Sequence, residues 1–150
     1  MSLQYNGEEH IPAPIDEVWA FVTDPEKVGH CFPEVSDVRV HDSTHFDADV
    51  KVGLGPVRGK FTLKVELQPD NAKRHLAMNV TGGGFGSAVD MTANADIAQA
   101  SATETTLTWS GKAEVRGPVA AVGGRVLDAQ AQKLIAQSFA TVRERLTAPA

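Results

Sequence analysis

Residues 57–67, VRGKFTLKVEL, decide the fold of this chain. Apolar or small side chains stand at every second position from Val57 to Leu67. The positions between them carry charged or polar side chains: Arg58, Lys60, Thr62, Lys64 and Glu66. A repeat of two residues is that of a β-strand with one apolar face and one solvated face. Such a strand needs another part of the protein, or a ligand, to cover its apolar face.

The same alternation recurs in six other segments, which are separated by turn residues such as Pro69-Asp70-Asn71. Strands are therefore expected over residues 3–11, 35–40, 46–52, 76–80, 85–97 and 105–115. Closely spaced strands with short turns favour a sequential antiparallel sheet. We expect seven strands in one sheet.

Two short helices and one long helix are predicted outside the sheet. After Pro14, apolar residues recur at helical spacing to about Thr23, and Asp24-Pro25 begins a second short helix that ends near Cys31. After Gly117-Pro118 the repeat becomes about 3.6 residues, which predicts a long amphipathic helix. That helix carries one broad apolar stripe: Val122, Val126, Leu127, Leu134, Ile135, Phe139, Val142 and Leu146.

The composition describes a soluble, mildly acidic chain that forms a single domain over residues 1–150. It has 150 residues, 42% of them hydrophobic, and a formal net charge of −5, which suffices for one core. Nucleic acid is not an expected partner, because phosphate binding needs a basic surface. No apolar run reaches the roughly 18–20 residues of a membrane span. Cys31 is the only cysteine, so no internal disulfide forms, which fits a reducing cytosol.

No catalytic or metal-binding constellation is predicted. The pair His41 and His45, with two aspartates nearby, makes a metal site imaginable, but we favour a solvated hairpin end. His30 beside Cys31 suggests an activated thiol, yet adjacent residues seldom have the required geometry, so we expect a structural cysteine. The glycine-rich segment 82–86 is expected to be a flexible joint between two strands, in the form of a hairpin or a bulge, and it does not open a helix as a phosphate loop does.

A cleft between the sheet and the C-terminal helix is the predicted ligand-binding site. The sheet side chains expected on its inner face are Phe61, Leu63, Met78, Phe85, Val89, Met91, Leu107 and Trp109. From the helix, the side chains expected to face them are Val126, Leu127, Leu134 and Ile135. Alternating apolar residues are usually core, so a packed core is the other interpretation.

Two features favour a cavity over a packed core. Methionines adapt to apolar ligands, and small residues recur on the inner face, which leaves volume unfilled. These small residues are Gly59, Ala93, Ala95, Gly111 and Ala113. No inward pair of carboxylates is expected, which gives acid–base catalysis in the cleft little support.

Three basic residues, Arg58, Lys60 and Lys64, form a row on the outer face of one strand, and Lys51 is expected nearby. The plain interpretation is a solvated face. The alternative is a weak docking surface for an acidic partner or for an anionic membrane.

The order of elements resembles the helix-grip fold of the START and Bet v 1-like (SRPBCC) superfamily. This is an α+β fold in which a seven-stranded antiparallel sheet curls around a long C-terminal helix, with two short helices after the first strand. The segment 14–19, PIDEVW, followed by Asp24-Pro25, is similar to the first helix of that superfamily. The segments 55–61, GPVRGKF, and 124–128, GRVLD, the latter followed by Lys133-Leu134 and Phe139, resemble the G-subunit family of the aerobic carbon monoxide dehydrogenase system. The resemblance covers nearly the whole chain.

The resemblance implies a non-enzymatic accessory protein without a catalytic cofactor. Members of the G-subunit family are linked to the maturation or membrane recruitment of molybdenum hydroxylases, and the wider superfamily binds lipophilic molecules such as quinones or lipids in its cleft. A cytoplasmic location is implied, with peripheral contact with the inner membrane as the alternative. Some members carry a membrane-anchoring C-terminal extension. This sequence ends at Ala150 without one, so we expect either a soluble variant or a chain from which the tail was removed.

Two other interpretations stay open. A polyketide cyclase or dehydratase-like enzyme of the same fold would need polar residues that face the cleft. His75 or Asp90 could serve if the strand register were off by one residue, whereas the only tyrosine, Tyr5, lies in the first strand. A protein-interaction module with a closed core would have no cavity and no ligand.

Overall fold

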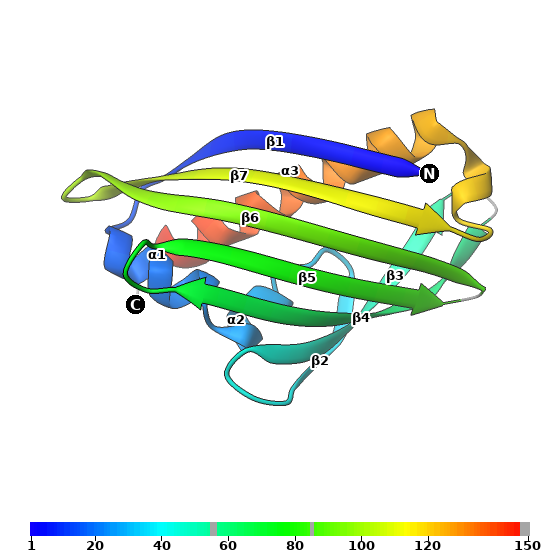
Figure 1. Ribbon diagram of the computed structural model, residues 1–150, viewed down its shortest axis with the longest axis horizontal. Helices are drawn as coiled ribbons and strands as arrows, with labels where there is room; N and C mark the ends of the chain where they lie inside the picture. Colours follow the sequence, from blue (N-terminus) through cyan, green and yellow to red (C-terminus); the bar gives the residue numbers. More distant parts are fainter. Residues whose placement is uncertain (55–56, 85, 148–150) are drawn as a thin grey trace.

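The structure, a computed structural model, describes residues 1–54, 57–84 and 86–147. One antiparallel sheet of seven strands forms its body, in the order β1-β7-β6-β5-β4-β3-β2 (Figure 1). The strands are β1 (Ser2–Ile11), β2 (Val35–Val40), β3 (His45–Leu54), β4 (Val57–Asp70), β5 (His75–Gly84), β6 (Ser87–Ser101) and β7 (Glu104–Arg116). The strands from β2 to β7 pair in sequence and β1 returns to pair with β7, so the predicted sheet is confirmed.

Two short helices, α1 (Ile15–Val22) and α2 (Pro25–Gly29), join β1 to β2. The Asp24 side chain accepts hydrogen bonds from the backbone N–H groups of Glu26 and Lys27, and Pro25 follows it at the first helical position. This cap satisfies N–H groups that have no partner within the helix. It explains why the sequence Asp24-Pro25 separates the two helices.

The long helix α3 (Gly124–Thr147) follows β7 and lies behind the sheet in Figure 1. A short 3-10 turn, η1 (Ala120–Val122), precedes it, and Gly123 between them has a φ of 101°. That left-handed conformation suits glycine and ends the turn. The helical repeat expected directly after Gly117-Pro118 is therefore split into a turn and a helix.

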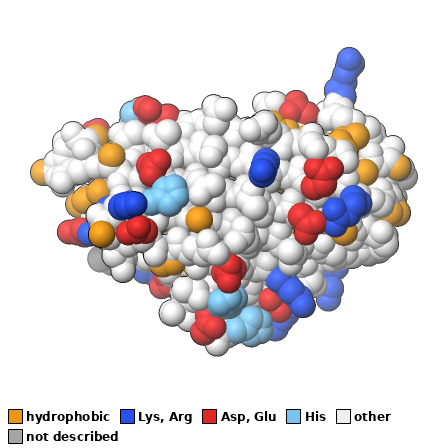
Figure 2. Space-filling model, viewed as in Figure 1, with side chains coloured by type: hydrophobic (Ala, Val, Ile, Leu, Met, Phe, Trp, Pro, Cys, Tyr) orange, Lys and Arg blue, Asp and Glu red, His pale blue; other side chains and the backbone are white. Residues whose placement is uncertain are grey.

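The alternation in β4 has the predicted effect on burial. Phe61, Val65 and Leu67 are at most 5% exposed on the inner face, whereas Lys60 and Lys64 are exposed on the outer face. Figure 2 looks onto the outer face, where hydrophobic side chains are scattered and polar or backbone atoms dominate. The sheet thus offers one apolar face to the helices and one solvated face to water.

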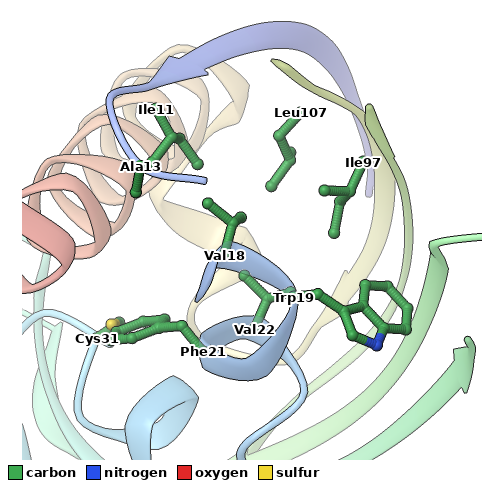
Figure 3. Close-up of a cluster of buried hydrophobic side chains, with 9 residues drawn as sticks. All are labelled: Ile11, Ala13, Val18, Trp19, Phe21, Val22, Cys31, Ile97 and Leu107. Atoms are coloured by element: carbon green, nitrogen blue, oxygen red, sulfur yellow. The ribbon is translucent and has the colours of Figure 1, made fainter. Parts of the chain in front are cut away.

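Three clusters of buried apolar side chains hold the inner face together. The first joins α1 to β1, β6 and β7, and Figure 3 shows Val18 pointing toward Ile97 and Leu107. The second joins the start of α3 to the far end of the sheet and contains Val50, Phe61, Val115, Val119 and Leu127. The third lies on β3, β4 and β5 and contains Phe46, Ala48, Val65, Leu67 and Val80.

The glycine-rich segment links β5 to β6 as an antiparallel hairpin, as expected, but its first three glycines lie within a strand. Gly82, Gly83 and Gly84 all belong to β5. A Cβ built at Gly84 would overlap the carbonyl oxygen of Lys60 and the ring of Phe61, so β4 and β5 approach closely there. Glycine is needed for this close approach.

Candidate functional site

The strand register sets small residues in the middle of the inner face. One row across β1, β7, β6 and β5 consists of Tyr5, Gly111, Ala93 and Met78, and the next row consists of Leu3, Ala113, Met91 and Val80. Glycine and alanine side chains hardly rise above the backbone. Side chains in the middle of the inner face therefore extend less far toward α3 than those at its two ends.

Helix α3 makes no close contact with Gly111. Apart from its chain neighbours, only Thr92 and Ala93 among the described residues place an atom within 4 Å of a Cβ built at Gly111, at 3.6 and 3.7 Å. At Gly82, by contrast, the Cδ2 atom of Leu63 would lie 2.8 Å from such a Cβ. The inner face is therefore crowded by Leu63 near Gly82, whereas a Cβ at Gly111 would meet only ordinary contacts from the sheet.

Helix α3 is packed at its two ends and spans the middle of the sheet. Leu127 packs into the cluster at one end, and Phe139, Val142 and Leu146 pack against the cluster around α1 at the other. Between these ends, Leu134 is 38% exposed and Ile135 is half-buried. On the inner face of the sheet, the side chains of Met78, Met91, Ala93, Ala95 and Ala113 are also only half-buried. We call this partly open apolar space between α3 and the sheet the cleft.

The predicted cleft residues divide by burial. Phe61, Leu107 and Leu127 are buried in the clusters at the two ends of the cleft. The half-buried residues are Leu63, Met78, Val89, Met91, Trp109 and Ile135. Val126 and Leu134 are 45% and 38% exposed, and Phe85 lies outside the described residues. Solvent, and hence a ligand, can reach the half-buried residues among those predicted.

A hydrogen-bonded group joins β1 to the first half of α3. The Tyr5 hydroxyl donates to Asp128 Oδ1 at 2.6 Å, and Gln132 Nε2 donates to Asp128 Oδ2 at 2.9 Å. Burial, followed by the hydrogen bond to Asp128, raises the pKa of Tyr5 to about 12. The phenol is therefore neutral and acts as a donor at neutral pH.

A second polar group joins β1 to the second half of α3. Arg143 forms an ion pair with Glu9 and donates from Nε to the His10 carbonyl oxygen at 3.0 Å. Trp109 Nε1 donates to Glu9 Oε2 at 3.4 Å, and its ring lies 5.7 Å from that of Phe139.

These contacts correct the expectation that no carboxylates face inward. Glu9 and Asp128 both face the space between β1 and α3, although each is paired with another side chain. The alternation of β1 contained the signal for Glu9, because it shares the side of Leu3, Tyr5 and Ile11. Nothing in the sequence alone indicated the partners on α3.

The two polar groups frame a groove of about 350 Å³ along the open side of β1. We call it the β1–α3 groove. Its apolar walls come from Trp109, Ile135, Ala136 and Phe139, and its polar rim from Tyr5, Asn6, Glu9, Gln132 and Arg143. Trp109 and Ile135 line the groove and are also predicted cleft residues, so the groove adjoins the cleft.

Comparison with known proteins assigns the chain to a family. Residues 7–147 match the family described as the carbon monoxide dehydrogenase G-subunit (CoxG). The chain belongs to the CoxG family. Among curated proteins, none matches the sequence closely enough to count as a relative.

Solved structures support the fold of this CoxG chain. A conserved protein from Geobacillus kaustophilus has a TM-score of 0.86 at 27% identity, with 96% of this chain and 95% of that one covered. A START superfamily protein from Mycobacterium smegmatis has a TM-score of 0.71 at 15% identity, over 95% and 96% of the two chains. The Zhui aromatase/cyclase from Streptomyces sp. R1128 has a TM-score of 0.70 at 16% identity, over 97% and 94%. The helix-grip fold is therefore shared with START-like proteins, and it supports a ligand-binding type of protein.

Other predicted site residues lie away from the cleft of this CoxG chain. His75 hydrogen-bonds to Asp96 at 2.7 Å and Asp90 accepts from Arg116 at 2.6 Å, both on the outer face. The register is the one that the alternation predicted, so neither residue points into the cleft. No helix within the described residues combines the length and the apolar character that crossing a membrane requires.

Both histidines of the His41–His45 hairpin lie beside carboxylates. His45 Nδ1 lies 2.9 Å from Asp42 and its Nε2 lies 3.0 Å from Glu66, while His41 lies 3.2 Å from Asp47. The hydrogen bonds to Asp42 and then to Glu66 raise the pKa of His45. No cluster of three or more metal-ligating side chains occurs in the part of the chain that the structure describes.

Cys31 is a buried thiol in the cluster around α1. Burial raises the pKa of its thiol, which opposes formation of the reactive thiolate. The neighbouring His30 lies 3.9 Å from Glu26, its partner one turn earlier in α2. This arrangement agrees with the structural role expected for the cysteine.

The basic row on β4 is interleaved with acidic residues. Lys51 stands opposite Lys60 in the β3–β4 register, as expected, but Lys64 stands opposite Asp47. Lys60 Nζ also lies 3.9 Å from Asp49, a buried carboxylate that accepts two hydrogen bonds from Arg39. The row is therefore partly neutralised by its own neighbours.

Proposed function

We propose that this CoxG chain is a non-enzymatic accessory protein that binds a lipophilic small molecule in the cleft. The observation that carries the proposal is the partly exposed apolar middle of the inner face, where no atom of α3 lies within 4 Å of a Cβ built at Gly111, between two buried clusters. A packed interaction module would cover this apolar surface, because leaving it half-exposed forgoes roughly 25 cal/mol for each Å² of apolar area.

A quinone or a lipid is the ligand that we propose. Met78 and Met91 supply adaptable, half-buried walls, and Ala93 and Gly111 supply depth. Tyr5, Asp128 and Gln132 border the same row of the sheet and supply polar groups at one side. A planar or chain-like apolar molecule with one hydrogen-bonding end matches this distribution.

We further propose that the bound molecule serves the maturation, recruitment or electron delivery of a molybdenum hydroxylase. The name of the family supports an association with a carbon monoxide dehydrogenase. We place this role in the cytoplasm, with peripheral contact with the inner membrane when the ligand is exchanged. A docking role for Arg58, Lys60 and Lys64 is part of this proposal, and charge reversal at Lys60 and Lys64 should then abolish partner binding.

The experiment is native mass spectrometry of freshly purified protein, followed by organic extraction and by uptake of an added menaquinone analogue. Wild-type protein should carry or take up one apolar molecule. Gly111→Leu should lose uptake, because a leucine side chain there fills the open space. Lys112→Leu, the adjacent position on the outer face, is the matched control and should bind as the wild type does. Equal uptake by both variants would exclude the cleft as the site.

An enzyme of the same fold is the second candidate. The observation that favours it is the polar group of Glu9, Arg143 and Tyr5 beside the cleft, together with the fold shared with an aromatase/cyclase. These side chains are paired with one another or with α3, so a substrate would have to displace existing hydrogen bonds. Turnover of a poly-β-ketone analogue that Glu9→Gln abolishes would favour the enzyme, and uptake without turnover would favour the carrier.

A further inference from the structure

Strand β1 is an edge strand with one open side. It pairs with β7, and no other strand within the described residues lies beside it (Figure 1). Val115 N–H donates to the Met1 carbonyl oxygen, whereas Arg143 of α3 donates to the His10 carbonyl oxygen from the other side. Backbone groups alternate in direction along a strand. The even-numbered residues of β1 therefore direct their backbone N–H and C=O groups toward the open side.

Two hollows flank this open edge, one on each face of the sheet. On the outer face a hollow of about 540 Å³ lies over β1, β7 and β6, and its polar side chains include Asn6, Glu8, Asn94 and Asp96. On the inner side lies the β1–α3 groove of about 350 Å³. Asn6 and Trp109 line both. The hollows therefore lie at the same position along β1, around residues 5–9.

The chemistry of the two hollows differs. The outer hollow contains the carboxylates of Glu8 and Asp96, whose neighbours are histidines: His10 at 3.2 Å and His75 at 2.7 Å. It favours a basic side chain by charge complementarity. The groove has aromatic and aliphatic walls, and its one carboxylate, Glu9, is already paired with Arg143. It favours an apolar side chain.

We propose that β1 binds an extended segment of a partner protein as an eighth strand, and that this segment alternates basic and apolar residues. Side chains of a strand point alternately to the two faces of a sheet. One added strand would lie about 4.8 Å from β1. Its basic residues would then lie beside Glu8, at the near rim of the outer hollow, and its apolar residues beside the groove. The backbone of Gln4, Asn6 and Glu8 would supply the hydrogen bonds, as in other cases of strand addition. This interaction goes beyond ligand binding in the cleft and does not depend on it.

A second copy of this chain fits the edge less well. The outer-face residues of β1 are Ser2, Gln4, Asn6, Glu8 and His10. They include no lysine or arginine to meet the carboxylates of the outer hollow. A separate basic segment is the better complement.

The test uses a capped octapeptide of alternating valine and lysine, added to the ¹⁵N-labelled full chain. The expected result is slowed hydrogen exchange and shifted amide signals at Asn6 and Glu8, together with changed Trp109 fluorescence in a Trp19→Phe background. An octapeptide of alternating valine and glutamate is the control and should bind at least about tenfold more weakly, which corresponds to about 1.4 kcal/mol. Equal binding of both peptides, or shifts spread over other acidic residues, would overturn the proposal.

Variants at the edge sharpen this test. Asn6→Pro removes an N–H group that faces the open side, a place where an edge strand tolerates proline. Asn6→Pro should weaken binding of the valine–lysine peptide about tenfold. Asn6→Ala, which keeps the N–H group, should leave that binding unchanged. Exchange protection of β7 amides confirms that the sheet is intact in either variant. If the proline variant does not fold, Glu8→Lys replaces it and should weaken the same peptide through charge repulsion.

Sedimentation of the chain without peptide tests the alternative occupant. A monomer is the expected result. A dimer that Asn6→Pro dissociates would assign the edge to a second copy and would overturn the proposal of a partner segment.

Discussion

The α1 end and the middle of the inner face arise from the same alternating sequence, yet one is core and the other is cleft. At the α1 end, Val18 is fully buried and Leu107 is 4% exposed, because helix α1 lies directly on the sheet. In the middle, Met91 and Ala93 stay half-buried, and no atom of α3 comes within 4 Å of a Cβ built at Gly111. Side-chain volume and the position of the covering helix, not periodicity, separate a core from a binding surface.

The largest expected effect comes from truncating one residue in each region. Leu107→Ala should lower the free energy of unfolding by about 2–5 kcal/mol, because it leaves a cavity in a sealed cluster. Met91→Ala should cost less, because its site is already open to solvent. Urea unfolding of both variants measures the difference. Similar losses in the two variants would mean that the middle is packed core.

Two glycines provide the next contrast. Gly84→Ala should destabilise by about 1–3 kcal/mol, because its Cβ overlaps Lys60 and Phe61. Gly111→Ala should be neutral or stabilising by up to about 1 kcal/mol, because its Cβ meets only ordinary contacts and the unfolded chain loses freedom. Thermal unfolding of the pair checks this order. A destabilised Gly111→Ala would contradict an open space above Gly111.

Loss of the ion pair between Glu9 and Arg143, near the α1 end of α3, should have a smaller effect on the free energy of unfolding. Arg143→Met keeps the apolar stem but leaves Glu9 without its partner, and we expect a loss of about 1.5 kcal/mol. The double variant Arg143→Met with Glu9→Gln should recover part of that loss. A double-mutant cycle by urea unfolding measures the coupling, and a coupling near zero would show that the pair does not hold α3 to β1.

The smallest expected effect is a pH-dependent change in stability that involves Tyr5, which lies beside Gly111 in the sheet. Its pKa is raised from 10.0 to about 12, so the unfolded chain ionises first as the pH rises. The stability from this neutral phenol is complete below pH 10.0 and is lost progressively toward pH 12. The stability difference between wild type and Tyr5→Phe should therefore shrink over that range, as measured by urea unfolding at several pH values. Parallel curves would mean that the hydrogen bond to Asp128 does not perturb the phenol.

Much of this fold was predictable because each strand carries its own signal. The alternation of residues 57–67 and the change of repeat after Gly117-Pro118 predicted the sheet and the long helix, and the strand bounds differ by a few residues at most sites. Val126 and Leu134 show that helical spacing does not predict which residues of the apolar stripe become buried. Both belong to the apolar stripe by spacing, yet both are exposed, because the sheet contacts another flank of α3.

The sequence by itself determined the alternation, the caps and turns, and therefore which side chains share a face, because these depend on neighbours a few residues apart. Only the three-dimensional packing shows that Glu9 meets Arg143, that Tyr5 meets Asp128, and that the row through Gly111 stays half-buried. These pairs join residues more than 100 positions apart in the chain. Their contact depends on where α3 crosses the sheet, and that crossing is set by the packing of both of its ends rather than by any local pattern.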